Sequence, residues 1–231
     1  MENVGDIITQ AKIDLKDPTF PGHFTKAMMY GWASEGQREI ARRTDCLQKQ
    51  TGNIASLMNA DTIEQSLATL IPDTEVIGLF NVYAGTSTSK KALTFTTIPV
   101  LDRDNMYWRG RTSGTPTKVY VGPGQTLGFA DAPPSATWLS ANGVYIIYSC
   151  LPLVNFTSDS QVPEISRKAW DYIVDYCVLK GKREDREFTA FDRTFMMWKD
   201  GLAFIKSEPR IDVKGRTSRI IPPGGVGLHK P

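Results

Sequence analysis

A run of large apolar side chains near the end of the 231-residue chain constrains its fold more than any other feature. These side chains recur at steps of three and four residues: Phe188, Phe191, Phe195, Trp198, Leu202 and Ile205. This spacing places them along one side of an α-helix as a heptad seam. Because an exposed seam of this size would promote aggregation, it must pack against other helices. The sequence therefore predicts a helical bundle that includes this region.

Two segments near the start of the chain have the pattern of amphipathic helices. Apolar residues recur at helical spacing from Val4 to Leu15, and this helix should end before Pro18, since proline disfavours a helical conformation in the residue that precedes it. The second helix is expected to begin after Thr25, whose hydroxyl can cap it. The side chains expected to pack inward from this helix are Met28, Trp32 and Ile40.

A third helix is predicted to start at Pro163, because proline at the first helical position loses no hydrogen bond. Its apolar stripe runs from Ile165 to Cys177, and Gly181 is expected to end it. The middle of the chain instead has the composition of β-strands, with β-branched and aromatic residues. The expected strands cover residues 76–83, 93–100, 118–121, 127–130 and 144–151, and a tight hairpin turn is expected at residues 122–125.

The last part of the chain differs in composition from the rest. Residues 206–231 contain no aromatic residue, four prolines, and six Lys or Arg residues against two Asp or Glu residues. Such a segment has too little apolar surface to fold alone and is expected to form an extended arm. We therefore predict an α+β fold: an antiparallel helical bundle from residues 1–72 and 156–206, an inserted β-rich domain at 73–155, and an extended C-terminal arm at 207–231.

The residues that usually carry catalysis or bind metal are sparse. Cys46, Cys150 and Cys177 are far apart and form no CxxC pair, and the two histidines, His23 and His229, lie near opposite ends of the chain. A zinc site needs clustered ligands, so no metal, cofactor or catalytic residue is predicted. No stretch approaches the roughly 20 apolar residues of a membrane helix, and the first residues lack the basic segment of a secretory signal.

One segment combines aromatic and basic side chains: Tyr107, Trp108, Arg109 and Arg111. Such a group is typical of a contact with another subunit, and it could also stack on nucleic acid. Together with the basic arm, it leaves open a nucleic-acid-associated accessory binding protein. A small enzyme with an unrecognised site is a third alternative, which the few histidines and cysteines disfavour.

An ordered set of motifs resembles the head-to-tail adaptor proteins of tailed bacteriophages, the neck or connector ring proteins that include the tail tubular type. The resemblance covers about residues 23–206. It rests on the helical segment Trp32–Ala41, the segment Leu127–Pro134 with its two prolines, the strand Val144–Tyr148, the helix from Pro163 with Ala169 and Tyr172, and the final aromatic helix.

The resemblance implies a virion structural protein without catalysis, located in the neck or tail and assembled in the host cytoplasm. Its implied partners are copies of itself in a ring, commonly dodecameric, the portal protein, and a tail tube, nozzle or stopper protein. The ring would join the portal to the tail, and double-stranded DNA would pass through its lumen without sequence-specific binding. No membrane contact is implied.

The resemblance also implies that the C-terminal arm docks on the portal. The basic residues that would meet an acidic portal surface are Arg210, Lys214, Arg216 and Arg219. The apolar residues that would fill a groove there are Ile220, Ile221, Pro222 and Pro223. The segment with Tyr107, Trp108, Arg109 and Arg111 is the expected contact with the next tail component.

Overall fold

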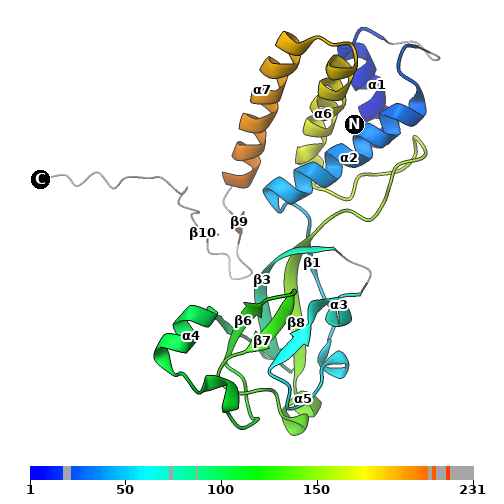
Figure 1. Cartoon of the computed structure of the whole chain (residues 1–231). Coiled ribbons are helices and arrows are strands. Elements are labelled where there is room, and N and C mark those ends of the chain that lie inside the picture. The colour runs from blue at the N-terminus through cyan, green and yellow to red at the C-terminus, as the bar shows by residue number, and fades with distance from the viewer. Residues whose placement is uncertain (18–21, 73–74, 87, 208–209, 212–216, 219–231) are drawn as a thin grey trace, which may run out of the picture. The chain divides into compact units, whose positions relative to one another are not determined.

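Two units make up the chain, one helical and one β-rich (Figure 1). The computed structural model describes residues 1–17, 22–72, 75–86, 88–207, 210–211 and 217–218. The helical unit comprises Met1–Cys46 and Pro152–Pro231, and the β unit is the inserted segment Leu47–Leu151.

Helices from both ends of the chain form the helical unit: α1 (Val4–Asp14), α2 (Lys26–Thr44), α6 (Trp170–Glu184) and α7 (Phe188–Ser207). α6 packs against α1, α2 and α7, and α2 also contacts α1 and α7. The apolar stripes predicted from the sequence supply much of its core, including Ile8, Ile173 and Trp198, but Phe188 and Phe195 of the predicted seam are exposed. The predicted bundle, with the aromatic helix as one member, is therefore confirmed.

The start of α2 is capped as predicted, but its packed side differs at one of the predicted positions. The Thr25 hydroxyl accepts a hydrogen bond from the Met28 backbone N–H at 3.3 Å. Met28 itself is exposed, so its predicted inward position is wrong, and the next residue, Met29, is fully buried with Ala33 and Ile40. Ile40 is buried as predicted, and Trp32 is half-buried with its ring 5.3 Å from that of Phe24.

The third predicted helix begins later and ends later than expected. Residues 163–166 are not helical, a 3₁₀ turn covers Arg167–Ala169, and α6 starts at Trp170. The segment around Pro163 is held instead by α2, because the Gln37 side chain accepts a hydrogen bond from the Glu164 N–H at 3.0 Å. Gly181 lies inside α6, where a Cβ atom would come within 2.6 Å of Leu15 Cδ2, so its small size allows α1 to approach rather than ending the helix.

The β unit contains two four-stranded sheets. The first has the order β1–β8–β3–β4, and all of its pairs are antiparallel: β1 (Gln48–Gln50), β8 (Gly143–Cys150), β3 (Val76–Gly85) and β4 (Lys90–Ala92). The second has the order β2–β7–β6–β5, and only β5–β6 is parallel: β2 (Glu64–Ser66), β7 (Thr126–Phe129), β6 (Lys118–Gly122) and β5 (Thr94–Phe95). The predicted hairpin turn at 122–125 joins β6 to β7, with Gly124 at a φ of +71°.

Two parts of the β unit differ from the prediction. Residues 47–72, expected with the helices, supply β1 and β2, which pair with β8 and β7. The strand expected over 93–100 is limited to β5, because Pro99 suits the first turn of the short helix α4 (Ile98–Asp104). The other short helices of this unit are α3 (Leu67–Leu70) and α5 (Ala136–Ala141).

The protein is therefore α+β, with helices from both ends of the chain in one bundle and a β-rich segment inserted between them. Of the predicted arm beyond α7, the described residues are β9 (Arg210–Ile211) and β10 (Thr217–Ser218), which form an antiparallel pair. Within the described residues, no helix is both long enough and apolar enough to cross a membrane.

Candidate interaction surfaces

α7 carries apolar side chains on its solvent-facing side as well as on its packed side. Trp198 and Leu202 are buried against the bundle, whereas Met196 and Met197 are each 66% exposed. Met196 is bordered at helical spacing by charged residues of both signs: Asp192, Arg193, Lys199 and Asp200. We call Met196, Met197 and these four charged residues the α7 outer face.

The packed side of α7 borders a groove of about 320 Å³ between α2, α6 and α7. Its charged groups already have partners within the unit: Glu35 accepts hydrogen bonds from the Tyr176 hydroxyl at 2.7 Å and from Lys180 Nζ at 2.8 Å. Burial acts to raise the pKa of Glu35, but the bonds from Lys180 and Tyr176 outweigh it and hold that pKa below its usual value. Arg43 lies over the Trp198 ring, 5.5 Å from its centroid. The Glu35 bonds therefore join α2 to α6, and the Arg43–Trp198 contact joins α2 to α7.

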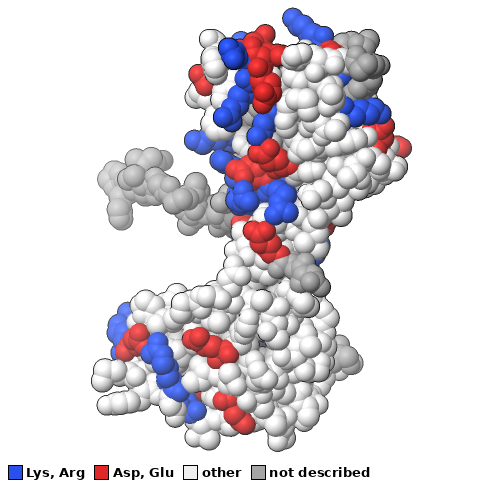
Figure 2. All heavy atoms as spheres, turned by 45° about the vertical axis from the view of Figure 1, so that its right-hand side comes forward, with Lys and Arg blue, Asp and Glu red and all other residues white. Residues whose placement is uncertain are grey.

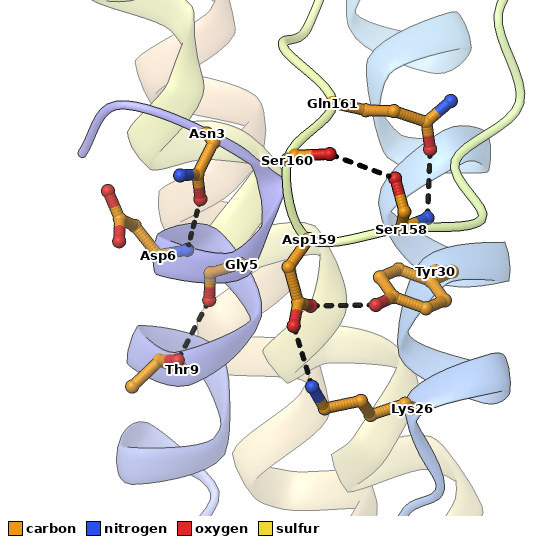
Figure 3. Close-up of polar contacts among 10 residues, drawn as sticks. All are labelled: Asn3, Gly5, Asp6, Thr9, Lys26, Tyr30, Ser158, Asp159, Ser160 and Gln161. Carbon is orange, nitrogen blue, oxygen red and sulfur yellow. Dashed lines mark hydrogen bonds and ion pairs between the residues drawn. The ribbon is translucent and has the colours of Figure 1, made fainter.

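A loop of the helical unit, residues 152–166, fastens α1 to α2 (Figure 3). Asp159 points from this loop toward α2, where its carboxylate accepts from Lys26 Nζ and from the Tyr30 hydroxyl, both at 2.7 Å. Its backbone carbonyl accepts from the Gly5 N–H of α1 at 3.0 Å. The Lys26 and Tyr30 bonds lower the pKa of Asp159, and burial together with this carboxylate raises the pKa of Tyr30 to about 12. One side chain and its backbone thus connect two helices.

The same loop exposes three apolar side chains, Leu153, Val154 and Val162, at 51%, 39% and 56% exposure. The Glu164 carboxylate accepts hydrogen bonds from the backbone N–H groups of Leu153 and Val154, each at 2.8 Å. Because Val162 lies two residues before Glu164, this carboxylate brings the two ends of the loop together. We call Leu153, Val154 and Val162 the loop patch.

The aromatic and basic segment of the β unit is divided between the interior and the surface. Trp108 is buried at 2% exposure, with its ring 5.2 Å from that of Tyr120, whereas Tyr107 is 78% exposed. Asp102 accepts bonds from Trp108 Nε1 at 2.8 Å and from Arg109 at 2.9 Å, and the Trp108 bond is the main reason that its pKa is lowered. Arg111 is exposed and donates to the Asp131 carbonyl at 3.3 Å. Trp108 therefore supports the segment from inside, and the exposed members are Tyr107, Arg109 and Arg111.

A cavity of about 460 Å³ lies beside the β3–β4 hairpin. Trp138, Asn142 and Lys91 contribute to its lining, together with hydroxyl groups from the hairpin and from residues 115–117. Its mixed lining does not identify a ligand class.

Most of the residues expected to bind the portal lie outside the described residues: Lys214, Arg216, Arg219, Ile220, Ile221, Pro222 and Pro223. Arg210 belongs to the described strand β9. The expected portal site therefore stays a prediction.

Groups suited to catalysis remain scattered across the described residues. Cys150 and Cys177 are buried, and desolvation raises the pKa of the Cys177 thiol. His23 forms an exposed pair with Asp185 at 3.1 Å. No cluster of three or more His, Cys, Asp or Glu residues suited to a metal ion occurs among the residues that the structure describes.

Acidic and basic side chains are interleaved on the face shown in Figure 2, beside broad uncharged areas. Glu39, for example, pairs with both Arg42 and Arg43 of its own helix. This arrangement differs from the continuous basic groove of a single-strand-binding protein.

Neither Met196 and Met197 nor the loop patch was singled out from the sequence. The signal for the methionines was present, because they lie on α7 away from the predicted heptad seam. The loop patch had no comparable periodic signal, since its residues are joined only through the fold.

A comparison with curated proteins finds no match for this chain. Residues 2–218 match the family described as SU10 adaptor protein, a match that spans both the helical unit and the β unit. The resemblance drawn from the ordered sequence motifs is thereby confirmed. The chain belongs to the SU10 adaptor protein family and is a bacteriophage structural adaptor.

Proposed function

We propose that this adaptor forms a closed homo-oligomeric ring that joins the portal to the tail. The observation that carries the proposal is the family match over residues 2–218, which includes both units. The α7 outer face supports self-assembly, because a single chain leaves its two methionines in water. By resemblance to neck proteins, the ring is a dodecamer that assembles in the host cytoplasm and then becomes part of the virion.

The genome passes through the lumen of this ring without sequence-specific contacts. A net charge of +2 on 231 residues, with acidic and basic groups interleaved, suits a wall that DNA slides past better than one that holds it. The role is structural, and the scattered histidines and cysteines suit such a role.

The C-terminal arm, residues 207–231, is the proposed portal contact. Its basic residues Arg210, Lys214, Arg216 and Arg219 would meet an acidic surface of the portal. Its apolar residues Ile220, Ile221, Pro222 and Pro223 would enter a groove there. A segment that becomes ordered on binding can cover a large surface across several subunits.

The exposed residues Tyr107, Arg109 and Arg111 are the proposed contact with the next tail component. Tyrosine and arginine are favoured at protein interfaces. Trp108 supports these residues from the interior, because its ring packs on Tyr120 and its Nε1 donates a hydrogen bond to Asp102.

Co-purification with the portal protein of the same phage tests the proposal. The full chain should co-purify with the portal and form rings by negative-stain electron microscopy. A chain lacking residues 207–231 should retain its circular dichroism spectrum and lose the portal, whereas the Tyr107→Ala chain should keep it. Attachment by the truncated chain would refute the arm as the portal contact, and failure of the full chain to bind the portal would refute the proposed function.

A further inference from the structure

We propose that the α7 outer face of one copy packs against the loop patch of the next copy. This inference rests on the proposed ring, and it identifies the two surfaces that would form each subunit contact. The structure points to it because one unit carries two different exposed apolar surfaces, Met196–Met197 on α7 and Leu153, Val154 and Val162 on the loop.

The two surfaces lie on opposite sides of α2. Gln37 faces the loop, donating to the Val154 carbonyl at 3.1 Å, whereas Glu39 lines the groove beside α7. Residues two positions apart on a helix point about 160° apart. Figure 1 shows the same arrangement, with α7 at one side of α2 and the yellow-green loop at the other.

Both surfaces are firmly held by their own chain. Trp198 anchors α7 by donating from Nε1 to the Tyr172 carbonyl of α6 at 3.0 Å. The loop is held by Asp159 on Lys26 and Tyr30 and by Glu164 on the N–H groups of Leu153 and Val154. A preorganised surface loses little conformational entropy on association.

A second copy of the chain is the partner that suits both surfaces, because one kind of contact, repeated between copies, buries both of them. In a head-to-tail ring every subunit uses one surface toward each neighbour, so closure leaves neither exposed. A two-fold pairing through α7 alone would bury the methionines and leave the loop patch in water. The charged residues around Met196 comprise two acidic and two basic groups, so the α7 outer face carries no net charge.

A mixing experiment with charge-carrying variants tests this directional contact. Met196→Glu with Met197→Glu disables the α7 outer face, and Val162→Glu disables the loop patch. Each variant alone should associate at least about tenfold more weakly than the parent chain in sedimentation, because a charge would enter an apolar contact. Met106→Glu is the matched control, since Met106 is 73% exposed in the β unit, and its association should be unchanged.

Mixing the two disabled variants should restore one contact, since one chain keeps its α7 outer face and the other keeps its loop patch. The mixture should therefore form dimers and no larger species. A mixture that stays monomeric, or a single variant that associates like the parent chain, would overturn the inference.

Cysteine cross-linking gives an independent readout in an otherwise full chain with Cys46→Ser. A chain that carries both Met196→Cys and Val162→Cys should form a ladder of disulfide-linked oligomers on oxidation. Chains with either cysteine alone should give no ladder. Dimers from the Met196→Cys chain alone, or no ladder from the double variant, would overturn the head-to-tail contact. Portal co-purification separates the two proposals, because a chain that binds the portal but fails these tests refutes only the assigned surfaces.

Discussion

At the scale of single residues, neighbouring aromatic side chains in the β unit have different roles. Trp108 is buried against Tyr120 and Tyr107 lies in solvent. Trp108→Ala should lower the free energy of unfolding of the β unit by about 3–5 kcal/mol, since it leaves a cavity and removes the hydrogen bond from Trp108 Nε1 to Asp102. Tyr107→Ala should change it by less than about 0.5 kcal/mol. Urea unfolding followed by circular dichroism measures both, and equal effects would contradict the buried role of Trp108.

Asp159 makes the stability of the helical unit depend on pH. Its pKa is lowered in the folded chain by Lys26 and Tyr30, so the ionised carboxylate stabilises the fold above about pH 4. This contribution is lost as the pH falls through the lowered pKa of the folded state. Asp159→Asn should cost about 0.5–1 kcal/mol at pH 7, a modest value because the pair is half exposed, and almost nothing at pH 2.

The measurement is urea unfolding of both chains at the two pH values. Thr9→Val is a suitable control, because it removes a side-chain hydrogen bond on α1 that carries no ionisable group. A cost for Asp159→Asn that is the same at pH 7 and pH 2 would contradict the ionic role of this carboxylate.

At the scale of helices, glycine has different roles on α7 and α2. A Cβ at Gly201 would lie 2.2 Å from Cε1 of Tyr172 on α6, whereas a Cβ at Gly31 meets nothing within 4 Å. Gly31→Ala should therefore stabilise the chain by about 0.5–1 kcal/mol through helix propensity. Gly201→Ala should destabilise it by about 1–3 kcal/mol, because the α6–α7 contact must open. Thermal unfolding distinguishes the two, and stabilisation by both changes would show that this contact is not close.

Helices were easier to predict than their ends, because a helix has a local periodic pattern whereas its end can depend on a tertiary contact. The six-residue seam from Phe188 to Ile205 specified α7 because its spacing repeats over several turns. The start of α6 depended on a tertiary contact, in which Gln37 of α2 accepts a bond from the Glu164 N–H and holds that segment outside the helix. A contact between residues 37 and 164 leaves no trace in local periodicity.

The candidate surfaces were only partly predictable for the same reason. The segment from Tyr107 to Arg111 was found by its composition, but the sequence could not show that Trp108 packs inward on Tyr120. The loop patch depends on Glu164 joining residues that are far apart in the loop. Strands β1 and β2 are each three residues long, too short for a reliable pattern, which explains why residues 47–72 were expected with the helices.

At the scale of the whole molecule, the first and last residues of the inserted β unit lie close together. The Cys150 N–H donates to the Leu47 carbonyl at 3.1 Å, so the two ends of the unit lie side by side. A fragment of residues 47–151 should therefore fold alone with cooperative thermal unfolding, because it retains every strand of both sheets. Its circular dichroism melt should show one transition.

A fragment of residues 73–155 is the informative comparison, because it removes β1 and β2 and keeps the rest of both sheets. The loss of β1 exposes the edge of β8 that pairs with Gln48–Gln50. The loss of β2 exposes the edge of β7 that pairs with Glu64–Ser66. It also removes Glu64, whose carboxylate accepts a 2.7 Å bond from the buried Tyr120. Unpaired edges of this kind promote aggregation, so the shorter fragment should unfold at a lower temperature or precipitate. Equal stability of the two fragments would show that residues 47–72 are not part of the β unit's folding core.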